Sequence, residues 1–184
     1  MLALHGVPLL LQAGVPLVLL AWQALERNRS IAQWLMKTAA VAGYLVAAHM
    51  VGLWAVLPWY TALVLLVVLT AIVLWQLRAV PQLPWTSARS SRLAWIGRGS
   101  LALLVLVSLA IAVAARQPPP ETIVNLQFPL HDGTYYVAAG GSMGLLNPHL
   151  MTLTESRFQA VRGQSYGVDI VKLGSFGLRA SGLL

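Results

Sequence analysis

The chain has 184 residues, of which 58% are hydrophobic and only 9% are charged. A water-soluble domain usually carries about 25% charged residues, so the composition excludes an ordinary soluble protein and predicts that most of the chain faces lipid. The net charge of +7 does not indicate nucleic acid, because Lys and Arg gather in the cytoplasmic loops of membrane proteins. The absence of cysteine excludes disulfides and thiolate metal ligands.

Four apolar stretches predict four transmembrane helices. The first covers residues 2–25 and is too long for a signal peptide, so we expect it to be retained. Pro16 lies in its middle and predicts a kink, because proline removes one backbone hydrogen bond. The second stretch follows the polar residues 26–30 and ends at Pro58, and the third covers residues 59–78.

The fourth stretch, residues 101–115, is short for a bilayer of about 30 Å. Extending it back through Ile96 closes most of the gap, with the Arg98 side chain reaching toward the lipid headgroups. The sequence therefore predicts an α-helical membrane protein with a four-helix anchor over residues 1–115.

The positions of the cations predict the orientation of this anchor. Basic residues occupy the two segments that join the first span to the second and the third to the fourth, whereas the N-terminal tip and the turn at residues 57–60 carry none. By the positive-inside rule both basic segments are cytoplasmic, and both termini lie on the non-cytoplasmic side. The basic residues are Arg27, Arg29, Lys37, Arg78, Arg89, Arg92 and Arg98.

The composition changes after Arg116. Residues 116–121 form a Pro-rich spacer, which is typical of a stiff, extended segment. Residues 122–184 then show short runs of β-forming residues separated by turn signals. We therefore expect a small, incomplete all-β segment there, with strands near residues 122–128, 133–139, 158–161 and 166–173.

Histidines and carboxylates supply the candidate functional groups. His49 lies within the second span, where an ionisable side chain is a functional hypothesis by default, and the alternative is a neutral histidine hydrogen-bonded to a neighbouring helix. The C-terminal segment holds imidazoles and carboxylates, which together suit zinc. No HExxH pair is present, so structural or solvated roles remain the alternative. These residues are His131, Asp132, His149, Glu155 and Asp169.

Five short motifs add a family resemblance. They are NLQFPL at 125–130, GTYYV at 133–137, GG at 140–141, NPH at 147–149 and QSYGVDIV at 164–171. Together they resemble the opening of the peptidase M23 (lysostaphin-like) metallopeptidase family, and most of all its membrane-anchored branch. The resemblance covers about residues 122–184 and none of the four spans.

The resemblance implies a zinc-dependent endopeptidase that cuts peptide cross-bridges of bacterial cell walls. In this family a histidine, an aspartate four residues later and a histidine of a downstream HxH motif hold the metal. Asp169 matches the aspartate, but Ser165 stands where the first histidine is expected. His149 is the candidate substitute, so the metal ligands implied here are Asp169 and His149. The sequence stops at Leu184 before an HxH motif, so we expect a truncated chain that binds zinc weakly and does not hydrolyse peptides.

Three functions follow as hypotheses. The first is a membrane-anchored M23-type zinc metallopeptidase that meets peptidoglycan peptides outside the cell. The second is a non-catalytic membrane protein whose degenerate tail binds or regulates an envelope partner, which the serine at position 165 favours. The third is a small transporter or channel, for which His49 is the one intramembrane group. In all three the lipid bilayer is a partner and nucleic acid is not.

Overall fold

The structure is a computed structural model that describes residues 9–51, 57–86, 91–114, 116–117, 127, 130–141, 147–174 and 176–177. The chain divides into two compact units. The first comprises Met1–Gly52 and Tyr60–Ala110, and the second comprises Leu53–Trp59 and Ile111–Leu184.

The first unit begins with a helix that changes its winding. A π-helical turn, η1 (Leu10–Gly14), runs directly into α2 (Val15–Leu25), and the Val15 N–H donates to the Leu10 carbonyl. Pro16 lies two residues after this π turn and inside the continuous helix, where its missing N–H removes one backbone hydrogen bond. The irregularity predicted around Pro16 is therefore a π turn that ends just before the proline.

Helix α3 (Ile31–Val51) has a side-chain cap at its start. Ser30 Oγ accepts a hydrogen bond from the Gln33 N–H at 3.2 Å, and Gln33 Oε1 accepts one from the Arg29 N–H at 3.2 Å. This reciprocal arrangement is close to a capping box and satisfies N–H groups that the first helical turn leaves unpaired. The polar residues before α3 therefore fix where the helix begins.

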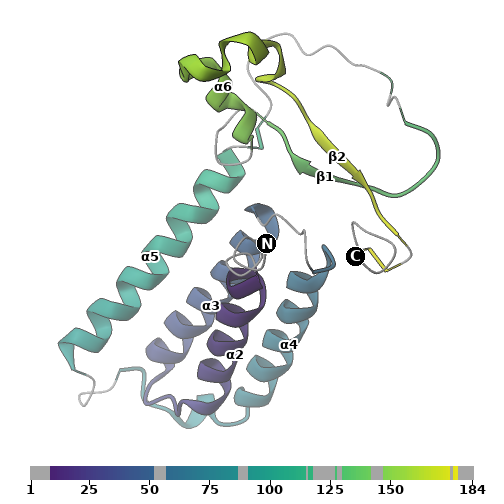
Figure 1. Cartoon of the computed structure of the whole chain (residues 1–184). Helices are drawn as coiled ribbons and strands as arrows, with labels where there is room; N and C mark the ends of the chain where they lie inside the picture. Colours follow the sequence, from purple (N-terminus) through teal and green to yellow (C-terminus); the bar gives the residue numbers. More distant parts are fainter. Residues whose placement is uncertain are drawn as a thin grey trace. The chain divides into compact units, whose positions relative to one another are not determined.

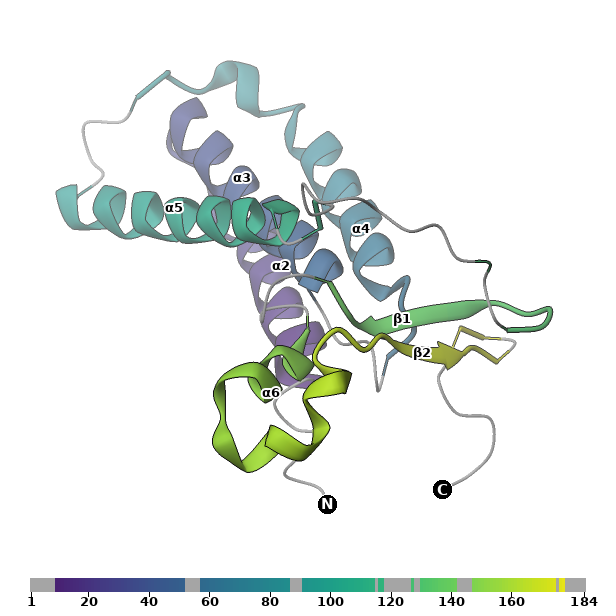
Figure 2. The same cartoon turned by 90° about the horizontal axis from the view of Figure 1, so that it is seen from above.

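Helices α2, α3 and α4 (Thr61–Gln76) pack side by side as a bundle (Figures 1 and 2). Their buried core is aliphatic and consists of Leu20, Val41, Leu45 and Leu69. A short 3-10 turn, η2 (Val80–Gln82), follows α4. The chain after η2 returns to the start of α3, where the N–H groups of Ile31 and Ala32 donate to the carbonyls of Pro84 and Trp85.

A buried polar network lies at one end of this bundle. Gln23 Nε2 donates to Thr38 Oγ1 and to Gln76 Oε1, at 3.0 Å each. Gln76 Oε1 also accepts from Trp34 Nε1 at 2.8 Å, and Gln76 Nε2 donates to the Gln23 carbonyl at 2.6 Å. Because buried polar groups are costly when unpaired, these bonds fix the relative registration of α2, α3 and α4.

The remaining long helix is α5 (Arg92–Ala114), and two of its residues that contact the bundle, Arg98 and Val105, are seven apart and so share one face. Arg98 Nη2 lies 3.2 Å from Glu26 Oε1, so this guanidinium pairs with a carboxylate just after α2. Val105 is buried against Gly43 of α3. Most other apolar side chains of α5 are exposed.

Two helices, α3 and α5, are long and apolar enough to cross a membrane by length and composition. The prediction of four transmembrane helices is wrong, because the other apolar helices, Leu10–Leu25 and Thr61–Gln76, fall below that length. The 16 residues of α4 rise only about 24 Å, against a hydrocarbon core of about 30 Å. The apolar runs in the sequence were longer than the helices that they form.

The second unit contains a two-stranded antiparallel sheet, β1 (Tyr135–Ala139) and β2 (Asp169–Lys172), whose strands lie side by side in Figure 2. Val137 pairs with Ile170, and the register shifts between Val137 and Ala139. β1 ends at two glycines with positive φ, Gly140 at 156° and Gly141 at 101°. The strands predicted near 133–139 and 166–173 are confirmed, each with narrower bounds.

The prediction of an all-β segment is wrong. Between the strands lie a 3-10 turn η3 (Pro148–Leu150), a short helix α6 (Met151–Thr154) and a 3-10 segment η4 (Ser156–Gln164). The strand expected at 158–161 is wrong, because these residues form part of η4. The segment is rich in residues that are not strong strand formers, such as Arg, Gln and Gly. The strand expected at 122–128 lies outside the described residues except for position 127.

Candidate metal centre

Asn147 shapes the segment that carries His149. Its backbone is extended, and its Oδ1 accepts a hydrogen bond from the His149 N–H at 3.0 Å, which caps η3. Pro148 occupies the first position of that turn, where a missing N–H is harmless. The motif Asn-Pro-His therefore ends an extended stretch and starts a tight turn, with His149 in the middle of the turn.

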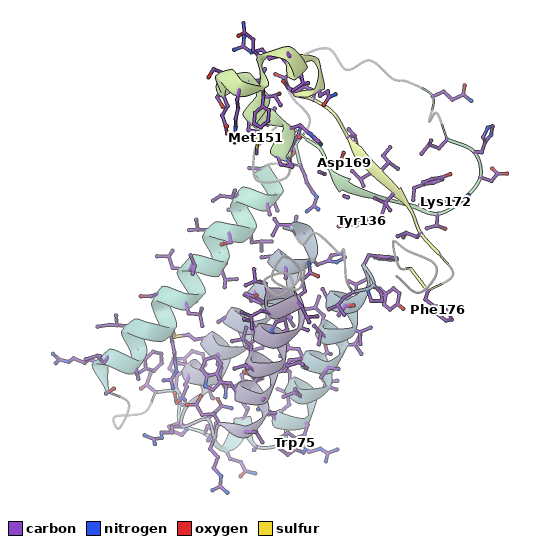
Figure 3. The ribbon with its side chains drawn as sticks, in the orientation of Figure 1. Trp75, Tyr136, Met151, Asp169, Lys172 and Phe176 are labelled. Carbon is purple, nitrogen blue, oxygen red and sulfur yellow. The ribbon has the colours of Figure 1, made fainter. Side chains whose placement is uncertain are left out.

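Asp169 is the first residue of β2 and is reached through a turn at the end of η4. The Gly167 N–H donates to the Gln164 carbonyl at 2.8 Å, and this tight turn directs the chain into the strand. A side chain at position 167 would come within 3.0 Å of the Gln164 carbonyl and within 3.8 Å of the His149 ring. Figure 3 shows Asp169 at the beginning of β2, with Lys172 further along the strand.

The fold brings the two predicted ligands together across 20 positions of sequence. His149 Nε2 lies 3.2 Å from Asp169 Oδ1, and the two side chains are 30% and 54% exposed. The atoms are close enough for an ion pair, but Nε2 has no aligned hydrogen-bond partner within the described residues and is itself shielded from solvent.

The spacing of these two atoms fits a single zinc ion. Zinc binds histidine nitrogen and carboxylate oxygen at about 2.0–2.2 Å in a tetrahedron, so two such ligand atoms are separated by about 3.3 Å. The observed 3.2 Å matches that edge. The same 3.2 Å also fits a direct His–Asp ion pair, so the spacing is compatible with a metal between the two atoms but does not by itself require one.

The other candidate ligands do not join this pair. Glu155 is engaged with Arg157, whose Nε lies 2.6 Å from the carboxylate. Ser165 is 1% exposed, and its hydroxyl donates to the Arg162 carbonyl at 2.6 Å and pairs with Thr152 Oγ1. Within the described ranges, no three His, Asp or Glu side chains are grouped so that they could hold a metal, and this includes His131 and Asp132.

The residues that position the pair were not identified from sequence as such. Asn147 and Thr152 are both buried and both hydrogen-bond to the backbone of His149. The signal for Asn147 was its place before a proline, since asparagine commonly caps a following turn. Thr152 carries no comparable signal, because threonine three residues after a histidine is unremarkable in any sequence.

His49 lies in the last turn of α3. Its Nδ1 is buried and has no hydrogen-bond partner among the residues that the structure describes, so the neighbouring-helix bond considered above is not observed at that atom.

Comparisons of the chain with protein-family models, curated proteins and solved structures found no match. The resemblance to peptidase M23 therefore depends only on the motifs quoted above.

Proposed function

We propose that this chain is a membrane-bound protein of the M23-type zinc metallopeptidase class, with His149 and Asp169 as metal ligands. The observation that carries the proposal is the 3.2 Å approach of His149 Nε2 to Asp169 Oδ1. Two residues of opposite chemistry, one in a turn and one at a strand start, meet at the spacing that a tetrahedral metal requires. On this proposal His149 serves as the metal ligand in place of the histidine that the family has at the position of Ser165.

His149 and Asp169 are the residues that would hold a zinc ion, which would supply Lewis-acid chemistry at this place. The residues of this chain do the binding and the orientation: the η3 turn presents imidazole, and the start of β2 presents carboxylate. Catalytic zinc has about three protein ligands, and the described residues provide two. Peptide hydrolysis therefore needs a third ligand from elsewhere, and with two ligands alone the site binds metal without turnover.

A zinc titration tests this site directly. The purified full-length chain in detergent, competing with a chromophoric chelator, is expected to bind one zinc ion. Replacing His149 by alanine should weaken binding by at least about a hundredfold, since loss of a ligand exceeds the loss of an outer partner. His131→Ala is the matched control and should bind like the wild type. Failure of the wild type to bind zinc, or equal binding by His149→Ala, would refute the metal site.

A non-catalytic role is the second candidate. It is favoured by Ser165, which is buried and bonded internally where the family has a ligand, and by the absence of a three-ligand group within the described residues. On this proposal the tail binds an envelope partner. Zinc binding at full occupancy by the wild type would argue for the metallopeptidase class, and no binding would argue for the partner-binding role.

We also propose that the C-terminal segment lies on the non-cytoplasmic side. Arg89, Arg92 and Arg98 flank or begin α5, and Arg116 is the one cation among the 20 residues that follow it in the sequence, so the positive-inside rule keeps the start of α5 in the cytoplasm. An α5 that crosses the bilayer then delivers the tail to the side where cell-wall peptides are found.

Cysteine labelling checks this orientation, and the chain offers a clean background because it contains no cysteine. A single cysteine replacing the exposed Arg157 should react with a membrane-impermeant maleimide in intact cells. A cysteine replacing the exposed Trp85, before α5, should react only after the cells are permeabilised. The opposite pattern would exclude a role in the cell envelope.

A further inference from the structure

A single buried amide joins the two segments that carry the proposed ligands. Asn147 is 0% exposed, and its Nδ2 donates both to the Gly141 carbonyl at 3.0 Å and to the Ser165 carbonyl at 3.1 Å. Its Oδ1 accepts the His149 N–H at 3.0 Å. Both amide protons and the amide oxygen are therefore used.

These three bonds reach three different parts of the chain. Gly141 follows β1, Ser165 precedes the turn into β2, and His149 lies in η3. Gly141 has a φ of 101°, a backbone conformation that favours glycine. The side chain of Asn147 thus ties the backbone on the Asp169 side to the backbone on the His149 side.

We propose that Asn147 is a positioning residue that sets the separation of His149 and Asp169. The proposal adds a role for Asn147 to the proposed metal function, and the metal arm of its test depends on that function. Thr152 assists, because its Oγ1 donates to the His149 carbonyl at 2.8 Å and contacts Ser165 Oγ. The His149 backbone is therefore held at its N–H by Asn147 and at its carbonyl by Thr152.

All three partners of Asn147 are backbone atoms, which allows a test without metal. Cysteines at 149 and 169 leave these bonds intact, and dibromobimane becomes fluorescent only when both of its arms have reacted with thiols. In the full-length chain the His149→Cys, Asp169→Cys pair should therefore cross-link rapidly. Adding Asn147→Ala should slow cross-linking by about tenfold, since buried groups lose their partners. Asn147→Asp should slow cross-linking to a similar extent, because a carboxylate can still accept the N–H of residue 149 but cannot donate to the Gly141 and Ser165 carbonyls.

Two controls separate positioning from general folding. Thr154→Ala removes a hydroxyl of α6 that donates to the Met151 carbonyl and leaves the bonds of Asn147 and Thr152 to His149 in place, so it should change the rate less than twofold. A second reporter pair, Val137→Cys with Ile170→Cys, spans directly paired positions of the sheet and should cross-link equally with or without Asn147.

The outcomes are distinct. Slower cross-linking at 149 and 169 with an unchanged sheet reporter supports the proposal. Unchanged cross-linking at 149 and 169 overturns it, and loss of both reporters overturns it in favour of a general structural role. As a second arm, Asn147→Ala in the otherwise native chain should weaken zinc binding about tenfold. Absence of zinc binding in the wild type would remove the metal function and leave the cross-linking result to decide the role of Asn147.

Discussion

Replacing Lys37 by methionine is expected to lower the free energy of unfolding of the helical unit by about 1–3 kcal/mol, because it removes the buried amine from the cluster that Lys37 forms with Glu26 at the end of α2. The Lys37 side chain is 0% exposed. Its Nζ donates to the Glu26 carbonyl at 3.0 Å and to the Trp22 carbonyl at 3.4 Å, at the end of α2, and lies 3.7 Å from Glu26 Oε2. Methionine fills a similar volume but takes the amine away from the Glu26 carbonyl, whereas the Trp22 carbonyl keeps its bond from the Glu26 N–H.

The measurement is an SDS titration of the detergent-solubilised chain followed by circular dichroism. Arg157→Met is the matched control, because Arg157 pairs with Glu155 on the surface with a 70% exposed side chain, and such pairs contribute at most about 1 kcal/mol. Adding Glu26→Gln to Lys37→Met should cost less than the two single changes together, because the residues share one interaction. Equal stability of Lys37→Met and the wild type would show that the cluster does not stabilise the fold.

Replacing Gly43 by alanine is expected to destabilise the helical unit by about 2 kcal/mol, because a Cβ at this position of α3 would overlap the Val105 side chain of α5. Small residues at helix contacts allow close approach of the backbones, and this contact is one of the two points described above where α5 meets the bundle. The same SDS titration measures the effect.

Two further variants make this prediction specific. Gly97→Ala adds a methyl group to α5 where nothing lies within 4 Å, so it should be neutral or raise stability by up to about 1 kcal/mol through helix propensity. Val105→Ala combined with Gly43→Ala removes the overlap and should recover part of the loss. A destabilisation by Gly97→Ala as large as that by Gly43→Ala would mean that the glycine at 43 has no special packing role.

The sequence predicted the existence of the helices better than their ends. Apolar runs located α3 and α5, and the extension of the fourth run back past Ile96 was in the right direction, since α5 begins at Arg92. The same runs gave four spans because hydropathy does not report where a helix stops. Polar contacts decide that, such as the cap by Ser30 and the bonds between Gln23 and Gln76. These depend on tertiary structure and leave no local pattern.

For the candidate site, the sequence indicated which residue types could bind a metal, and the structure showed that His149 and Asp169 lie next to each other. Asp169 and His149 were chosen from a resemblance, and a tetrahedral spacing between them could not be derived from their separation in the chain. The strand predicted around Phe158 failed because a short apolar run fits a 3-10 turn as well as a strand. Asn147 was visible as a turn residue, but its two donated bonds to carbonyls on other segments were not.

The burial of Ser165 limits which side chains position 165 can accept. The residue is 1% exposed, and its hydroxyl donates to the Arg162 carbonyl. An imidazole there would exceed the space that serine occupies, at a cost of about 1–3 kcal/mol, and would displace the contact with Thr152. A change of this serine to histidine would therefore be tolerated only with a compensating change in the surrounding residues.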